Sequence, residues 1–409
     1  MSMIKVAYFC EPQIGGTFTY FQLLRPVLLQ RGIDFRCISP VSAERYVGSP
    51  FLQEPGVEFI TLSDDLPSAT LQIIERLERE DYQLAMVLPG ATLLSSSLPF
   101  YLPRSVRCVI HVPMMTRGAY VPTHALAPYL NRVYAVSDRI GDDLTRNYHL
   151  SRDLVQVIYH GVDPAPFSDA LKCKSKDGPV RLLYAGRLYD VDKGVFLLPP
   201  MMKSLRRSGA NVHLSIAGGG PDAAVLALRF EKAGVKENVS LLGPLSSRSL
   251  SEEYRKSDIF VFPSRFEGCG FAALEAMAAS CAPVMADIRG SLRVLAADGT
   301  AGRLARVGDA EDFARAIREL AADRVELSRL QAAARQRVLE RFTLDRMADE
   351  TARSFQSVCE TPDRRLPPRP LDQYEISSAF KPTWRTLVPR PIKNWIRNTN
   401  GANGALHIG

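Results

Sequence analysis

The sequence has little of what builds disulfide-linked, zinc-binding or membrane-spanning proteins. Its seven cysteines are an odd number with no Cys-x-x-Cys pair, which indicates neither a disulfide framework nor a zinc site. No apolar run reaches the roughly 18 residues of a membrane-spanning helix. Residues 1–16 show no basic n-region and no leader cleavage site. We expect a cytoplasmic protein with reduced cysteines.

Several catalytic motifs are absent as well. The sequence has no Gly-x-Ser-x-Gly elbow, no His-Glu-x-x-His and no P-loop, which argues against hydrolase, zincin and NTPase functions. The net charge of +7 comes mainly from residues 361–409, where eight Lys/Arg face three Asp/Glu. The remaining chain is nearly neutral, so a nucleic-acid partner is not indicated.

Short apolar runs rich in β-formers alternate with segments of helical period, which predicts parallel sheets covered by helices. The alternation occurs twice, so we expect an α/β protein with two facing Rossmann-like domains and an interdomain cleft. The predicted parts are an N-terminal domain at 1–167, a C-terminal domain at 168–345, a helix at 346–360 and a basic Pro-rich tail at 361–409.

The segment Phe266–Met277 is the most informative part of the chain. It follows a predicted strand at Ile259–Phe262 and opens a predicted helix. Its small residues let the backbone approach a ligand, and the free N–H groups of a helix start favour an anion. Glu275 lies too far into the helix to be a cap, but its carboxylate is placed to reach a ribose hydroxyl.

Glu267 and Glu275 are separated by seven residues and resemble the Glu-x7-Glu motif of the retaining glycosyltransferases of family 4, which have the GT-B fold. Gly186-Arg187-Leu188 and Lys193-Gly194 are similar to that family's Gly-Arg-Leu and Lys-Gly pair, whose Arg and Lys hold the donor diphosphate. Further similar segments are Ala135–Ser137, Val157–Asp163 and Ile216–Pro221.

The resemblance implies a metal-independent, retaining enzyme without a cofactor, with the acceptor on the N-terminal domain (1–167) and the nucleotide-sugar donor on the C-terminal domain (168–345). It would move a hexosyl-type sugar from a nucleotide diphosphate donor, UDP before GDP, to a hydroxyl of a glycan, a lipid-linked acceptor or a small molecule. The implied catalytic residues are Arg187, Lys193, Glu267 and His111. The implied donor-binding residues are Gly15, Gly16, Gly218, Gly243, Cys269, Gly270, Phe271 and Glu275.

Each of these residues has a structural alternative. Glu275 would otherwise be a surface or structural carboxylate and Glu267 a solvated loop charge. Arg187 and Lys193 would be members of a surface ion pair, and His111 a strand-end histidine in a satisfied hydrogen bond. The spacing of Arg187 and Lys193 is one residue longer than the family pattern, which predicts an enlarged loop. That loop contains Asp190-Val191-Asp192, which we do not interpret as a metal site because Lys193 can hold phosphate.

Three other functions compete with this one. Gly268, Gly270 and Ala273 fit a dinucleotide fingerprint, but residues 263–267 separate them from the strand, which argues against a nicotinamide-dependent oxidoreductase. A GT-B sugar-nucleotide epimerase and a non-catalytic nucleotide-sugar-binding protein remain as alternatives.

The tail suggests a further partner. Trp384 and Trp395 lie within Lys381–Arg397, which has five Lys/Arg and no Asp/Glu. Basic residues interleaved with interfacial aromatics are typical of segments that contact an anionic membrane, here the inner membrane surface. The alternatives are that the tail packs on its own N-terminal domain or forms a homodimer.

Overall fold

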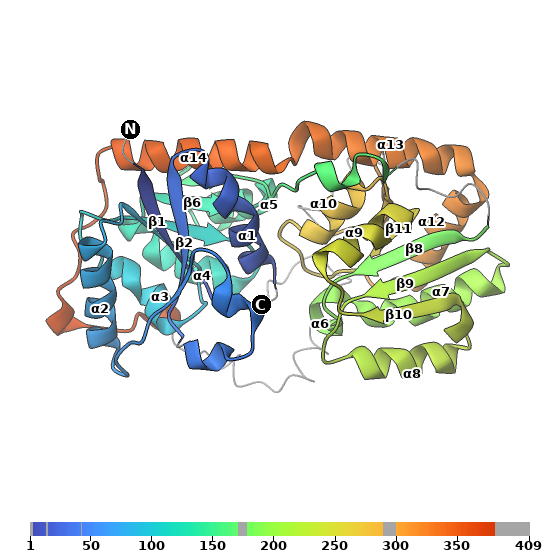
Figure 1. Cartoon of the computed structure of the whole chain (residues 1–409), viewed down its shortest axis with the longest axis horizontal. Helices are drawn as coiled ribbons and strands as arrows, with labels where there is room; N and C mark the ends of the chain where they lie inside the picture. The colour runs from blue at the N-terminus through green and yellow to red at the C-terminus, as the bar shows by residue number, and fades with distance from the viewer. Residues whose placement is uncertain (1–2, 14, 42, 171–177, 289–299, 381–409) are drawn as a thin grey trace. The chain divides into compact units, whose positions relative to one another are not determined.

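The computed structural model describes residues 3–13, 15–41, 43–170, 178–288 and 300–380, and it divides into two compact units. The first unit is Met1–Tyr159 with Leu344–Gly409, and the second is His160–Thr343. The chain therefore leaves the first unit once and returns to it at helix α14 (Leu344–Glu360) (Figure 1). Two α/β units, as the alternating pattern predicts, are confirmed.

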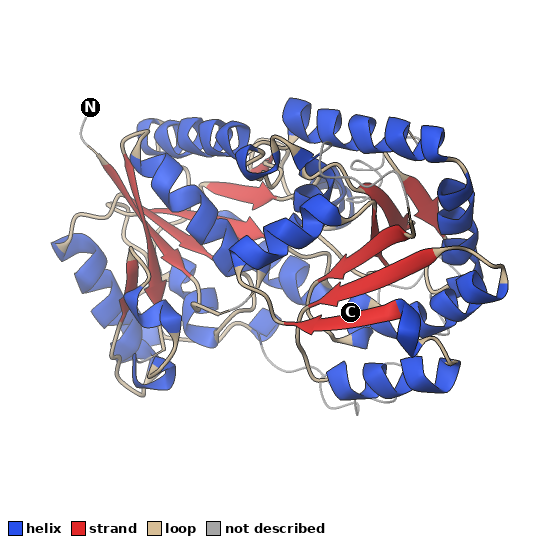
Figure 2. Cartoon of the chain, turned by 45° about the vertical axis from the view of Figure 1, so that its right-hand side comes forward, coloured by secondary structure: helices blue, strands red, loops and turns tan. Residues whose placement is uncertain are grey.

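The first unit is built on a parallel sheet with the order β3-β2-β1-β4-β5-β6-β7 among the described residues. Its central strands β1, β4, β5 and β6 are mostly apolar and buried, because helices cover the sheet (Figure 2). The strands are β1 (Ile4–Phe9), β2 (Ile33–Ser39), β3 (Val57–Phe59), β4 (Leu84–Val87), β5 (Arg107–Val112), β6 (Arg132–Ala135) and β7 (Val155–Val157).

The helices of the first unit begin where the sequence supplies caps and pack through apolar faces. Asp65 and Thr116 accept hydrogen bonds from backbone N–H groups of the first turns of α2 and α4. Besides α14, the helices are α1 (Gly16–Leu29), α2 (Leu66–Arg79), α3 (Leu93–Ser97), α4 (Arg117–Leu126) and α5 (Asp138–Asp142). None of the helices in the described part of the chain is long and apolar enough to cross a membrane.

The second unit repeats the plan with a parallel sheet of order β10-β9-β8-β11-β12-β13 among its described residues. Its strands are β8 (Val180–Ala185), β9 (Val212–Ala217), β10 (Val239–Gly243), β11 (Ile259–Phe262), β12 (Ala282–Ala286) and β13 (Arg303–Ala305). The helices are α6 (Asp190–Lys193), α7 (Leu198–Arg207), α8 (Ala223–Ala233), α9 (Ser247–Lys256), α10 (Phe271–Ala278), α12 (Ala310–Ala322) and α13 (Arg324–Arg341).

Residues 361–380, called the C-terminal strap below, pack on the first unit. The guanidinium of Arg369 lies 4.2 Å from the ring centre of Phe100, and its backbone N–H donates to the Phe100 carbonyl at 2.7 Å. The ring of Tyr374 stacks on Tyr101 at 4.6 Å. For these residues the tail packs on its own N-terminal domain, whereas Trp384 and Trp395 lie outside the described residues.

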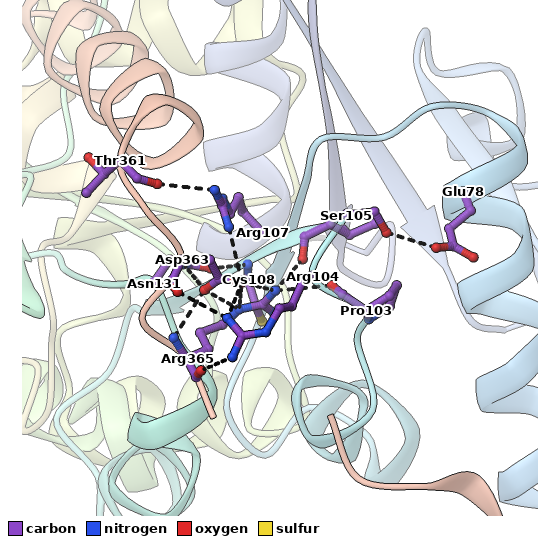
Figure 3. Close-up of polar contacts among 11 residues, drawn as sticks. Glu78, Pro103, Arg104, Ser105, Arg107, Cys108, Asn131, Thr361, Asp363 and Arg365 are labelled. Atoms are coloured by element: carbon purple, nitrogen blue, oxygen red, sulfur yellow. Dashed lines mark hydrogen bonds and ion pairs between the residues drawn. The ribbon is translucent and has the colours of Figure 1, made fainter. Parts of the chain in front are cut away.

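A buried ion pair begins the strap (Figure 3). Arg365 Nη2 pairs with Asp363 at 3.0 Å and donates to the carbonyl oxygens of Pro103 and Val106. Asp363 Oδ2 also forms an ion pair with Arg107 Nη1 at 3.1 Å, and Asp363 Oδ1 accepts a hydrogen bond from Asn131. Burial alone would raise the pKa of Asp363, but the hydrogen bonds and charge of Arg365 outweigh it and hold that pKa well below its usual range.

We expect Asp363→Asn to destabilise the first unit by roughly 3–5 kcal/mol, because it leaves the buried Arg365 guanidinium without its counter-charge. Urea unfolding at neutral pH measures the effect. Arg364→Ala is the matched control, since the Arg364 side chain is exposed and should change stability by about 0.5 kcal/mol or less. Equal stability of the Asp363→Asn variant and wild type would show that the pair does not hold the strap.

Candidate functional site

The candidate site lies at the switch point of the second sheet. Strands β8 and β11 are neighbours, with Leu183 beside Phe260 in the ladder, while their following connections lead to opposite halves of the sheet. Ligands of such sheets bind beyond the carboxyl ends of the strands at this point. The loops after β8 and β11 carry Arg187, Lys193 and Glu267, so the topology places three of the predicted residues on neighbouring loops.

Lys193 is held against the loop after β11. Gly194 is the C-cap of helix α6 and has a left-handed φ of 63°. A Cβ at Gly194 would overlap the carbonyl oxygen of Pro263. The Lys193 ammonium donates to Glu267 Oε2 at 2.7 Å, with the two side chains 19% and 15% exposed. The two residues that the sequence places in one site are therefore direct partners.

Arg187 is the exposed cation of the same loop. Its side chain is 60% exposed, and Nη2 pairs with Asp192 Oδ2 at 2.9 Å. Its backbone is fixed from the sheet, because the Tyr184 hydroxyl donates to the Arg187 carbonyl at 3.0 Å. The guanidinium is thus accessible while its loop is ordered.

The carboxylates of Asp190 and Asp192 already serve the loop itself. Asp190 Oδ1 accepts from the Phe196 N–H at 2.8 Å, and Oδ2 pairs with Arg265 at 3.1 Å. Asp192 is the partner of Arg187. A metal at this sequence would compete with these contacts, and within the described ranges no cluster of three or more His, Cys, Asp or Glu is arranged to hold one.

Helix α10 presents an open N-terminus. Gly270 is its N-cap, and among the described residues no side chain caps the helix, while its first turn holds no acidic residue. The Ala273 N–H donates to the Gly270 carbonyl at 3.1 Å, so the helix start offers an anion the N–H groups before Ala273 and the positive end of the helix dipole. A Cβ on Gly270 would lie 3.2 Å from the Phe262 ring and 3.3 Å from Glu267 Cγ, which accounts for glycine at this position.

His160 supports the same loop, a role that sequence reasoning missed. Its Nδ1 lies 2.7 Å from the carbonyl oxygen of Cys269, and its ring stacks on Phe271 at 4.2 Å. Burial lowers the pKa of His160 to about 4, so the ring is neutral near pH 7 and Nδ1–H is the donor. Cys269 and Phe271 are thereby held in place, one by its backbone and the other by its ring.

Glu275 lies on α10 facing a buried hydroxyl. The Tyr254 OH donates to Glu275 Oε2 at 3.1 Å. Burial raises the pKa of Glu275 to about 7, and the bond from Tyr254 opposes that rise. Glu275 therefore differs from a solvated carboxylate on a helix surface. Tyr254, at the end of α9, is a second contact that the sequence pattern did not indicate.

The predicted glycines of the second unit bring three loops together at the backbone. Gly218 has φ 140°, and a Cβ there would overlap the carbonyl oxygen of Gly186. Its N–H donates to the Gly243 carbonyl at 2.8 Å. The turns after β8, β9 and β10 are thus in direct contact, and substitution at Gly218 would force them apart.

The remaining predicted residues belong to the first unit. Gly15 is the N-cap of α1, which among the described residues has no side-chain cap, and both Gly15 and Gly16 are exposed. His111 is buried in β5, with Nδ1 3.1 Å from the Tyr8 hydroxyl and its ring stacked on Tyr20 at 4.4 Å. These contacts match the strand-end alternative for His111, and its proposed role toward a sugar stays a prediction.

Comparison with known proteins identifies a family whose model matches most of the second unit. Residues 171–337 match the family model described as Glycosyl transferases group 1. Glycogen synthase of Mycobacterium tuberculosis is 30% identical over 236 residues, which are 57% of this chain and 56% of that protein. The chain spans about half the length of the curated relatives it matches.

Solved structures share the fold. A glycosyltransferase from Rickettsia africae superposes with a TM-score of 0.72 at 17% identity, covering 88% of this chain and all of that one (100%). Anabaena HepE in complex with UDP gives 0.70 at 16% identity, covering 87% and 100%. These likenesses show the fold, which is GT-B.

The raised pKa of Glu275 predicts a pH dependence of stability. In the unfolded chain a glutamate has a pKa near 4.5, and in the fold the value is about 7, so the folded state binds the proton more tightly. Relative to Glu275→Gln, wild type should lose stability as pH rises from about 5 to about 7. Tyr254→Phe should extend the loss to higher pH, since it removes a bond that lowers the pKa.

Urea unfolding of wild type and Glu275→Gln at a series of pH values measures this difference. The Gln side chain does not titrate, so the difference in unfolding free energy between the two proteins removes the contribution of all other groups. A difference between the two proteins that stays flat over this range would show that the Glu275 carboxyl has an ordinary pKa.

Proposed function

We propose that the protein is a glycosyltransferase that takes a hexosyl-type sugar from a nucleoside diphosphate donor, UDP before GDP, without a metal or other cofactor. The acceptor is a hydroxyl of a glycan, a lipid-linked sugar or a small molecule. The observation that carries the proposal is that Arg187, Lys193 and Glu267 lie on the neighbouring loops after β8 and β11, at the switch point of a unit that matches the group 1 family.

The chemistry that these residues supply is stabilisation of a leaving diphosphate. Breaking a glycosyl phosphate bond places negative charge on the departing oxygen, and preorganised cations and helix dipoles lower the energy of that state. Arg187 offers a planar fork, Lys193 a point charge and the start of α10 free N–H groups. Together they can hold a diphosphate with no ion.

Glu275 and the neighbouring loops are assigned to the rest of the donor. A partly buried carboxylate is a strong acceptor for ribose hydroxyls, which is the role its family resemblance implies. Gly218 and Gly243 leave room for the backbone to approach the nucleotide, and Gly15 and Gly16 for phosphate or acceptor. We propose transfer with retention of anomeric configuration, as in the family, with Glu267 and His111 near the transferred sugar.

In the free protein both cations of the site have carboxylate partners. The diphosphate must therefore compete with Glu267 for Lys193 and with Asp192 for Arg187. The carboxylate partners keep the cations ordered before the donor binds, and the donor diphosphate then replaces them. This exchange also avoids leaving a half-buried ammonium uncompensated, which is costly in a protein interior.

The test is a thermal-shift screen of UDP-, GDP-, ADP- and TDP-sugars, followed by donor hydrolysis and transfer to an acceptor panel with EDTA present. One donor should raise the melting temperature and be consumed. Loss of turnover on chelation with recovery on Mn²⁺ would overturn the metal-free mechanism. Binding without turnover would favour a regulatory binding protein, and conversion of the sugar nucleotide without an acceptor would favour an epimerase.

Arg187→Ala and Lys193→Ala should each lower kcat/KM by a factor equivalent to about 2–4 kcal/mol, because each removes charge stabilisation of the leaving group. Steady-state kinetics with the identified donor measure the loss. Arg248→Ala is the matched control, an exposed ion-pair member on α9 of the same unit that should leave kinetics unchanged. Wild-type kinetics in both site variants would refute the assignment of the cations.

For the basic tail we propose contact with an anionic membrane surface, supported by the charge and tryptophans of Lys381–Arg397. Charge contributes roughly 1 kcal/mol for each Lys or Arg near an anionic leaflet, enough with a few inserted side chains for reversible attachment. Such attachment would concentrate the enzyme where a lipid-linked acceptor lies.

Liposome sedimentation of the full chain and of a chain ending at Phe380 tests this, because that end preserves the folded strap. Full-length protein should pellet with anionic vesicles and not with neutral ones, and the shortened chain should stay in the supernatant. Equal partitioning of the two chains removes the membrane role, and loss of a dimer on shortening would assign the tail to self-association.

A further inference from the structure

The loop after β11 holds helix α6 at both of its ends. Arg265 and Glu267 are two residues apart on that loop, and their partners Asp190 and Lys193 are the first and last residues of α6. Only the second of these pairs involves residues assigned to the donor. The Asp190–Arg265 pair has no such role and needs its own explanation.

Arg265 makes three contacts with α6. Its Nη1 pairs with Asp190 Oδ2 at 3.1 Å and donates to the Asp190 carbonyl oxygen, and its backbone N–H donates to the Asp192 carbonyl at 2.8 Å. The side chains of Arg265 and Asp190 are only 24% and 22% exposed. The guanidinium is therefore committed to α6, in contrast to that of Arg187, which is 60% exposed.

Asp190 connects a third loop to the same point. Its N–H donates to Asp222 Oδ2 at 2.7 Å, and the Asp222 N–H donates back to the Leu188 carbonyl at 3.1 Å. Asp222 follows β9, so the loops after β8, β9 and β11 all meet at Asp190. Removing the Arg265 contact would leave α6 attached to β11 through Lys193 and through backbone bonds.

Helix α6 has four residues, too few to be stable without external contacts, because a single turn fixes several dihedrals for one hydrogen bond. The Lys193–Glu267 pair cannot supply that stability throughout a donor-binding cycle, since a bound diphosphate competes for the same ammonium. A second attachment that does not involve the ligand is required to keep the Lys193 backbone in place during the exchange.

We propose that Arg265 is a positioning residue that, through Asp190, holds α6 and Lys193 in place while the donor diphosphate draws the Lys193 ammonium away from Glu267. The proposal rests on the proposed function for the identity of the ligand. It assigns the Asp190-Val191-Asp192 sequence to the ordering of a cation and separates Arg265, which never contacts the donor, from Arg187 and Lys193, which do.

Hydrogen exchange of the free protein tests the attachment without any donor. The Lys193 and Gly194 N–H groups bond within this turn to Tyr189 and Asp190. In Arg265→Met they should exchange about tenfold faster than in wild type, because local opening becomes easier. Asp190→Asn is the second variant and should show the same change. Unaltered exchange in both variants overturns the proposal.

Arg303→Met is the matched control for exchange and stability. Arg303 pairs with Glu326 in the same unit, and the two side chains are 30% and 27% exposed, close to the values for Arg265 and Asp190. Its loss should leave exchange at residues 193 and 194 unchanged. Equal acceleration in the control would mean that any lost ion pair loosens α6, which also contradicts a specific role for Arg265.

A double-mutant cycle with UDP as the probe tests the link to Lys193. Arg265→Met should weaken UDP binding about threefold or more in the wild-type background and less than about twofold in Lys193→Ala, because it acts through that lysine. Equal losses in both backgrounds would mean that Arg265 contacts the nucleotide itself. If wild type binds neither UDP nor GDP, the proposed function fails, while the exchange experiment still decides whether Arg265 holds α6.

Discussion

The site depends on one constraint, the direct adjacency of the carboxyl ends of β8 and β11. Because these strands pair in parallel, the loops that leave them start side by side, and the left-handed turn at Gly194 lets the first loop rest on the Pro263 carbonyl of the second. A side chain at Gly194 would separate the loops. The backbones of the two loops therefore place Lys193 beside Glu267 and bring the start of α10 close to Lys193.

Charge in the second unit is arranged in closed pairs around that point. The cations on the loops after β8 and β11 each pair with a carboxylate. The pairs differ in how exposed their side chains are, and this difference fits different roles. Arg187 is open to solvent, Lys193 is mostly covered but paired to another predicted site residue, and Arg265 is covered and paired to the loop. Exposure therefore separates cations that can meet a ligand from one that shapes the loop.

Local pattern predicted the two sheets and the loops that carry the site, because buried strands and capped helices are encoded by neighbouring residues. Strands β3 and β13 have three residues each, and so short a run shows no clear alternation by which the sequence alone would mark it. Contacts such as Tyr254 to Glu275 or His160 to Cys269 join residues 21 and 109 positions apart, and nothing local marks them. The Asp190-Val191-Asp192 sequence, which we do not interpret as a metal site, gave no sign that Arg265 is the partner of Asp190.

Glu267 lies before α10 and Glu275 lies within it, and this difference shows why their spacing matters physically. An acidic residue in the first turn would neutralise the helix dipole, and the structure has none there, so Glu267 remains outside the helix beside Lys193. Glu275 lies beyond the first turn, where burial and Tyr254 govern its charge. Neutral His160 fixes the carbonyl just before Gly270 without adding a charge that would compete for the anion. The first turn of α10 thus has no acidic residue of its own, and the Glu267 carboxylate beside its start is paired with Lys193.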